Sequence, residues 1–185
     1  MTRTRHFDTL AAHAGVAPDP ASGALAPPLQ LATTFEHAPD AATPLGYLYQ
    51  RYGNPNQAQL EQVLASLDGG ARGMFFATGM TAGTTLMQAL EPGSELLIAD
   101  DTYFGYRAVA GQWLARWGIR HTVVDMTDLD AVRAAVGPDT RLLWAETPSN
   151  PLLKVCDIAA LADIAHGAGA RLLVDGTFAT PVLQQ

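Results

Sequence analysis

The chain has 185 residues, of which 48% are hydrophobic and 16% are charged, so it has enough residues for one buried core. This composition excludes a disordered or low-complexity chain. The net charge of −7 and the absence of any cluster of Lys or Arg argue against binding nucleic acid or an anionic membrane through a basic surface.

The numbers and positions of cysteine and histidine argue against disulfide-bonded and metal-binding proteins. Cys156 is the only cysteine, which excludes an intramolecular disulfide and a zinc site built from several cysteines. The five histidines are scattered without paired spacing, so no metal site is predicted. Neither a secretory signal nor a run of 18 apolar residues is recognisable. We therefore expect a soluble protein of the reducing cytoplasm.

The first part of the chain, residues 1–57, is rich in proline, glycine, serine and asparagine. Proline at this density removes backbone donors and resists regular structure, so we expect an extended arm spread over another surface. From Gln57 the pattern changes to apolar residues at helical spacing, which end at Gly69 and Gly70. The expected division is an arm of residues 1–57 and a larger domain of residues 58–185.

After this helix, short apolar runs alternate with helical patterns. Because the runs are continuously apolar, we expect strands buried on both faces of a mainly parallel sheet, with helices between them. The fold class is therefore α/β. The expected strands are residues 74–78, 95–100, 121–125, 141–146 and 171–178, and the expected helices are 81–90, 104–118, 128–136 and 157–169.

In open α/β sheets, ligands bind beyond the carboxyl ends of the strands, so the residues that follow each run are candidates for a site. Thr78, Gly79 and Met80 open a helix and could bind a phosphate there, but such a turn taken alone is more often an ordinary N-cap. Asp175 follows a buried run and needs a partner, although it could simply cap a loop. A tyrosine at the position of Tyr103, taken alone, is more often a packing residue than a cofactor contact.

Two further candidates lie elsewhere. Asn150 in the segment PSNP is either a ligand contact or a turn residue. Tyr49 and Arg51 lie two apart in an extended segment and so share a face, where they would suit a phosphate or form a surface pair. A nicotinamide-binding domain would also fit the alternation, but the chain has no G-x-G-x-x-G fingerprint.

Five motifs in order and spacing carry a family resemblance: YxRYGNP, ATGM, DDTY, ETPSNPLLKV and VDGTFATP. From about His13 to Pro181 the chain resembles the Cys/Met-metabolism family of pyridoxal-phosphate enzymes, which includes cystathionine γ-synthase, the cystathionine lyases, methionine γ-lyase and the homoserine sulfhydrylases. The resemblance implies the fold-type I transferase-like architecture and the cofactor pyridoxal 5′-phosphate. It also implies a dimer, usually a tetramer.

The resemblance assigns a role to each candidate residue. Gly79 and Met80, with Thr78 where the family often has serine, would bind the cofactor phosphate. Tyr49 and Arg51 would reach the phosphate of the neighbouring subunit. The remaining assignments are Tyr103 stacking on the ring, Asn150 bonding its phenolic oxygen and Asp175 pairing with its nitrogen. Thr177 completes the set, and Gly176 departs from the asparagine of many relatives, which would loosen Asp175.

The family also uses a lysine that forms a Schiff base with the cofactor, and the resemblance places it beyond Gln185. Lys154, the only lysine, matches a non-catalytic position and is expected to be a solvated residue at the start of a helix. The resemblance likewise puts the last strands beyond Gln185. Residues 74–78 would then lack a neighbour, and the strand from Arg171 would form an open apolar edge prone to aggregation.

Two functions follow from the resemblance. The first is an enzyme that eliminates or replaces groups at Cβ or Cγ of a sulfur amino acid or an activated homoserine, with this chain alone inactive. The second is a non-catalytic truncated paralogue or fragment that binds pyridoxal phosphate weakly or pairs with full-length subunits.

Overall fold

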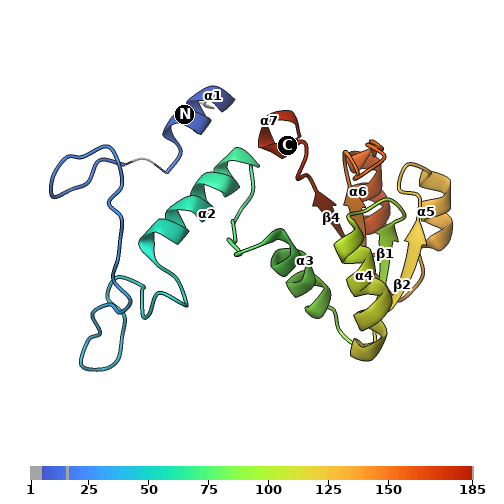
Figure 1. Ribbon diagram of the computed structural model, residues 1–185, viewed down its shortest axis with the longest axis horizontal. Coiled ribbons are helices and arrows are strands. Elements are labelled where there is room, and N and C mark those ends of the chain that lie inside the picture. The colour runs from blue at the N-terminus through green and yellow to red at the C-terminus, as the bar shows by residue number, and fades with distance from the viewer. Residues whose placement is uncertain (1–5, 16, 185) are drawn as a thin grey trace. The chain divides into compact units, whose positions relative to one another are not determined.

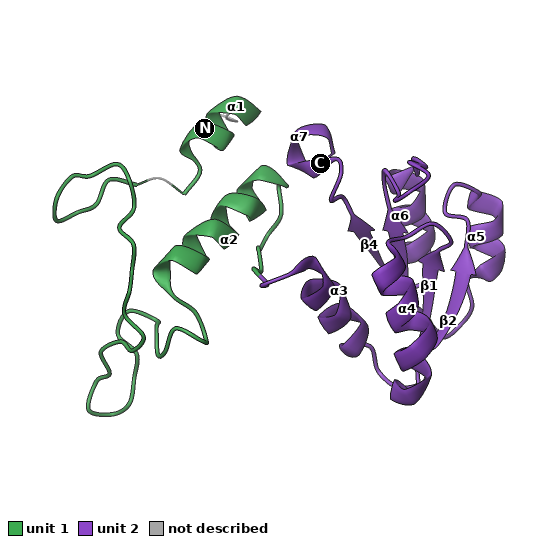
Figure 2. Ribbon diagram, in the orientation of Figure 1, with its two compact units in different colours: residues 1–75, 185 green, residues 76–184 purple. Residues whose placement is uncertain are grey.

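The computed structural model describes residues 6–15 and 17–184, which form two compact units (Figure 2). Unit 1 covers the described residues up to Phe75, and unit 2 covers Phe76–Gln184. Unit 1 contains the helices α1 (Phe7–His13) and α2 (Pro55–Leu67), and none of its described residues is buried. Residues 17–54 contain no helix and a single isolated bridge, between Thr34 and Tyr49.

Helix α2 confirms the helix that the apolar spacing predicts, but it begins two residues before Gln57. The side chain of Asn54 caps the helix by accepting a hydrogen bond from the Gln57 N–H at 3.0 Å. Pro55 suits the first position because no helical partner is needed for its nitrogen. Two apolar residues of the stripe, Leu60 and Leu64, remain 40% and 38% exposed, so unit 1 does not cover the stripe itself.

Unit 2 is a parallel sheet of four strands in the order β2-β1-β3-β4 (Figure 1). The strands are β1 (Glu95–Ala99), β2 (Arg120–Val124), β3 (Thr140–Glu146) and β4 (Arg171–Asp175). The helices are α3 (Gly79–Gln88), α4 (Phe104–Trp113), α5 (Leu129–Ala135), α6 (Ile158–Gly167) and the short α7 (Thr180–Leu183), with a 3₁₀ turn at Leu114–Trp117. The expected α/β class is confirmed.

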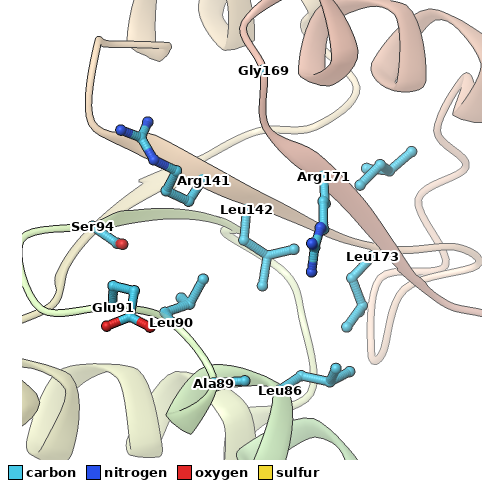
Figure 3. Close-up of a pocket in the computed structure, with 11 residues that line it drawn as sticks. Leu86, Ala89, Leu90, Glu91, Ser94, Arg141, Leu142, Gly169, Arg171 and Leu173 are labelled. Carbon is cyan, nitrogen blue, oxygen red and sulfur yellow. The ribbon is translucent and has the colours of Figure 1, made fainter.

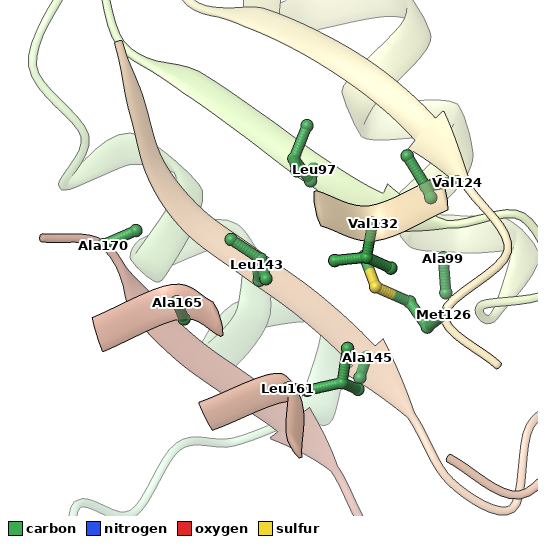
Figure 4. Packing of buried hydrophobic residues seen from close by; sticks show 10 residues of the cluster. All are labelled: Leu97, Ala99, Val124, Met126, Val132, Leu143, Ala145, Leu161, Ala165 and Ala170. Carbon is green, nitrogen blue, oxygen red and sulfur yellow. The ribbon is translucent and has the colours of Figure 1, made fainter. Parts of the chain in front are cut away.

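Two hydrophobic clusters cover the two faces of this sheet, because successive strand residues point to opposite faces. Leu97 and Leu143 lie in one cluster with residues of α5 and α6 (Figure 4). Leu96 and Trp144 lie in the other cluster with residues of α3 and α4. Burial on both faces explains why the strands read as continuous apolar runs.

Residues 74–78 do not form the expected first strand. Met74 is 67% exposed and Phe75 is 49% exposed, and no strand of the described residues pairs with this segment. A strand needs a neighbour to satisfy its N–H and C=O groups, and this segment has none in the sheet. The strand order β2-β1-β3-β4 also places β4 at one edge of the sheet, paired only with β3. The expected open edge at Arg171–Asp175 is therefore confirmed within the described residues.

Within the described ranges, no helix has both the length and the apolar character needed to cross a membrane.

Candidate active site at the carboxyl ends of the strands

The carboxyl ends of β3 and β4 bring two predicted segments together. Glu146, the last residue of β3, pairs in register with Asp175, the last residue of β4. The Thr147 N–H donates to the Asp175 carbonyl at 3.1 Å, one step beyond the ladder. The segment that carries Asn150 and the segment that carries Thr177 therefore leave the sheet side by side.

A tight turn holds the Asp175 carboxylate. Its Oδ1 accepts hydrogen bonds from the Thr177 N–H at 3.0 Å and from the Thr177 hydroxyl at 2.5 Å. None of the described residues donates to Oδ2, which leaves that oxygen available to a ligand. Gly176 takes no part in either bond, and a Cβ at this position would meet nothing within 4 Å. The expected loosening of Asp175 by Gly176 stays a prediction.

The start of α3 has the geometry of an anion site. Thr78 is the N-cap, and its hydroxyl oxygen accepts from the Thr81 N–H at 3.0 Å. The first backbone hydrogen bond of the helix runs from the Ala82 N–H to the Thr78 carbonyl. The N–H groups of Gly79 and Met80 come before this bond, so they have no partner within the helix. These amides lie at the positive end of the helix dipole.

The first turns of α3 and α4 lie against one another. The Tyr106 hydroxyl donates to the Gly79 carbonyl at 2.5 Å. A Cβ on Gly105 would lie 2.7 Å from Met80 Sδ and 2.8 Å from Tyr103 Cε1, so both side chains pack against this glycine. The predicted residues Gly79, Met80 and Tyr103 are therefore neighbours.

Glu146 is a buried carboxyl group that the sequence analysis did not include in the site. Its side chain accepts hydrogen bonds from the Thr102 hydroxyl at 2.9 Å and from the Tyr103 N–H at 2.6 Å. Burial raises the pKa of Glu146, and the nearby charge of Asp175 adds to the rise. The residue is recognisable in the sequence as the acidic end of an apolar run, but its partners depend on the fold.

Glu146→Gln is expected to change how stability depends on pH. A carboxyl group whose pKa is higher in the folded state than in the unfolded state removes stability as it ionises. The wild type should therefore lose stability relative to Glu146→Gln as the pH rises from the ordinary glutamate value of 4.5 through the raised folded value. We expect the free energies of unfolding of the two chains to diverge in this direction over that pH range.

Urea unfolding of the purified chain, followed by tryptophan fluorescence from about pH 4 to pH 8, measures this difference. Glu91→Gln is the matched control, because Glu91 is exposed. Parallel pH profiles for the wild type and Glu146→Gln would contradict the assignment of a raised pKa.

Lys154 is not the solvated helix-terminal residue that the sequence predicts. Its amine lies 3.0 Å from Asp100 Oδ2 and 3.0 Å from Asp125 Oδ2, and its side chain is 25% exposed. Helix α6 begins four residues later, at Ile158. Hydrogen bonds from the amine to Asp125 and then to Asp100 raise the pKa of Lys154. An amine held in its charged form is a poor nucleophile.

Tyr49 and Arg51 lie together in unit 1, although not through the extended backbone that their spacing of two residues was expected to have. The Arg51 guanidinium carbon lies 4.9 Å from the centre of the Tyr49 ring. The Gln50 N–H between them donates to the Thr33 carbonyl at 2.9 Å, and the Tyr52 N–H donates to the Tyr49 carbonyl at 2.9 Å. Residues 50–52 therefore form a turn and not the extended segment that we expected. The other predicted site residues all belong to unit 2.

A cavity of about 540 Å³ opens at the amino ends of β3 and β4 (Figure 3). Apolar side chains such as Leu86, Leu142 and Leu173 line it, together with Arg141 and Arg171. No predicted site residue lines this cavity, so it is separate from the candidate site.

Comparison with known proteins identifies the family. Cystathionine gamma-synthase of Mycobacterium tuberculosis is 44% identical over 178 residues, which cover 96% of this chain and 46% of that protein. Cystathionine beta-lyase of Coxiella burnetii is 39% identical over 181 residues, covering 97% and 46%. The crystal structure of metB from Corynebacterium glutamicum superposes with a TM-score of 0.92 at 38% identity, covering 96% and 46%.

The chain thus spans about half the length of the curated relatives it matches. The family described as Cys/Met metabolism PLP-dependent enzyme matches residues 8–185, which agrees with the five motifs and with the parallel sheet. On this evidence the chain belongs to the Cys/Met metabolism family of pyridoxal-phosphate-dependent enzymes.

Proposed function

We propose that this chain supplies the cofactor-binding part of a lyase or transferase that eliminates or replaces a group at Cβ or Cγ of a sulfur amino acid or an activated homoserine. The observation that carries the proposal is the convergence at one sheet edge of a helix N-terminus, an aromatic ring and a carboxylate with a free oxygen. The relatives named above are cystathionine synthases and lyases, which supports the same reaction class.

The residues of unit 2 fit pyridoxal phosphate by the chemistry of their donors and acceptors. The Gly79 and Met80 amides would bind the phosphate, and Asn150 would bond the phenolic oxygen. Tyr103 would cover the ring, and the free oxygen of Asp175 would hold a proton on the ring nitrogen. When bound, the protonated ring withdraws electrons from a substrate carbanion.

The amine that this chemistry needs is not supplied by Lys154. That residue is the only lysine in the sequence, and both of its carboxylate partners keep it charged. We infer that the Schiff-base lysine lies outside this chain and that the chain alone is inactive.

The second candidate function is a non-catalytic paralogue or fragment. It is favoured by the same observation, that Lys154 is the only lysine in the sequence. Intact mass of the natural protein under denaturing conditions separates the two. A mass well above 19.6 kDa supports the enzyme, and a mass of 19.6 kDa supports the non-catalytic form.

We further propose a cytoplasmic homodimer or homotetramer in which Tyr49 and Arg51 reach the site of the neighbouring subunit. The support is that unit 1 buries none of its described residues and exposes apolar side chains such as Leu29 and Leu31. Exposed apolar surface of this extent is typical of an interface.

Arg51→Ala is expected to weaken the affinity for pyridoxal phosphate. A charged hydrogen bond contributes about 1.5–3 kcal/mol, so the dissociation constant should rise about 10-fold to 150-fold. Equilibrium dialysis against the cofactor measures the change. Arg116→Ala is the matched control, because Arg116 also lies over an aromatic ring, that of Trp113, at 4.7 Å. Equal effects of the two substitutions would contradict a phosphate role for Arg51.

A further inference from the structure

The segment of residues 147–156 carries Asn150 from the end of β3 towards α6, and its backbone is bonded to itself. The Ser149 N–H donates to the Lys154 carbonyl at 3.0 Å, and the Lys154 N–H donates to the Ser149 hydroxyl at 2.9 Å. The Cys156 N–H donates to the Thr147 hydroxyl at 3.1 Å. These bonds give the loop a defined shape, but they do not attach it to the rest of the sheet.

Besides the bond from the Thr147 N–H to the Asp175 carbonyl, two attachments made by side chains join this loop to the strands beside it. Asp101, which follows β1 and is 6% exposed, accepts from the Ser149 hydroxyl at 2.5 Å and from the Leu152 N–H at 3.2 Å. The Lys154 amine donates to both oxygens of Asp100 at 3.1 and 3.0 Å, and to Asp125 at 3.0 Å. Asp125 follows β2, so one ammonium group joins the ends of three adjacent strands.

We propose that Lys154 is a positioning residue for Asn150, because its ion pairs with Asp100 and Asp125 hold the loop of residues 147–156 at the carboxyl edge of the sheet. This inference rests on the proposed function, in which Asn150 bonds the phenolic oxygen of the cofactor. Lys154 would then act without touching the cofactor, through the loop that carries Asn150.

The charges of Asp125 and Lys154 persist over a wide pH range. Hydrogen bonds from Thr127, and then from Lys154, lower the pKa of Asp125 to about 2. The stability that ionised Asp125 contributes to the fold is fully present above pH 3.8, the ordinary pKa of an aspartate. It is lost as the pH falls through the lowered pKa of about 2. The stability that the charged Lys154 amine contributes is lost only at high pH. Its pKa is raised above 10.5, the ordinary value for a lysine, so the charge is lost only as the pH rises through that raised pKa. The attachment should therefore be intact at the pH of any practical binding assay.

The test measures both loop order and cofactor affinity in the purified chain. Lys154→Met should increase hydrogen exchange of the amides at residues 149–156 on the order of tenfold, while the amides of β3 keep their protection. It should also weaken binding of pyridoxal phosphate about as much as Asn150→Ala does. Lys154→Arg, which keeps the charge, should restore most of both properties.

The double variant decides between positioning and general stability. If Lys154 acts through Asn150, then Lys154→Met combined with Asn150→Ala should bind the cofactor no more weakly than Asn150→Ala alone. Arg133→Met is the matched control, because it removes an exposed ion pair with Asp130 at 2.8 Å on α5. The control should change neither loop exchange nor affinity.

Three results would overturn the inference. Unchanged exchange in the loop would show that the ion pairs do not hold it. Additive losses of affinity in the double variant would show that Lys154 acts on stability alone. If Asn150→Ala does not weaken cofactor binding, Asn150 has no role in it and that part of the proposed function fails. If Asn150→Ala weakens cofactor binding but Lys154→Met does not, only the positioning role of Lys154 is overturned.

Discussion

Asp175→Ala should lower the turnover number of the complete enzyme on the order of 10²-fold to 10³-fold, the usual effect of removing one preorganised electrostatic partner. The carboxylate would keep the ring nitrogen protonated, and alanine cannot do so. The structure already fixes this carboxylate through Thr177, so it is held in place before the cofactor binds. Turnover is measured at saturating cofactor, which separates a loss of catalysis from a loss of affinity.

Asp163→Ala is the control for this prediction, because Asp163 is exposed on α6 and has no place in the proposed site. Its turnover should equal that of the wild type. Normal turnover of Asp175→Ala would contradict the assignment of Asp175 as the partner of the ring nitrogen.

Mixing two impaired variants, at a cofactor concentration that saturates the wild type but not Arg51→Ala, provides a test of the shared site. If Arg51 reaches the neighbouring subunit, a dimer of one Arg51→Ala chain and one Asp175→Ala chain contains one intact site. A random equal mixture should then regain about a quarter of the wild-type sites. No recovery after subunit exchange would contradict the shared site.

The second large effect is expected from Gly83→Val, which should lower the free energy of unfolding by about 2–3 kcal/mol. Gly83 is buried in the middle of α3, where a Cβ would overlap the Tyr106 ring and lie 2.6 Å from Trp144 Cη2. Because the Tyr106 hydroxyl also holds the Gly79 carbonyl, displacement of this ring would disturb the start of α3. Cofactor affinity should therefore fall together with stability.

Gly111→Ala is the matched control, because Gly111 is also helical but a Cβ there would meet nothing within 4 Å. Alanine should raise the free energy of unfolding by about 0.5–1 kcal/mol, since glycine loses more conformational freedom on folding. Urea unfolding measures both changes. A Gly83→Val chain as stable as the wild type would contradict the packing of α3 on Tyr106 and Trp144.

Sequence patterns predicted those parts of the fold that depend on neighbours along the chain. Apolar spacing predicted α2, and the apolar run from Arg141 to Glu146 predicted β3 with both faces covered. Residues 74–78 have an equally apolar sequence, yet a strand requires a pairing partner that sequence spacing does not reveal.

The candidate site shows the same limit. Asp175 and Thr177 are predictable because their motif is local, whereas the roles of Glu146 and Lys154 depend on which strands are adjacent. Glu146 meets Tyr103 across 43 positions, and Lys154 meets Asp100 across 54 positions. Their partners become visible only when the order of the strands is known.

The absence of buried residues from the described part of unit 1 has a consequence for assembly. Such a segment gains little free energy from its own folding, so in the proposed dimer its order would come from the surface of the other subunit. Ordering of the arm and association of the subunits would then be one event governed by mass action. Dilution below the dissociation constant of the dimer would disorder the arm and remove Tyr49 and Arg51 from the phosphate in the same step.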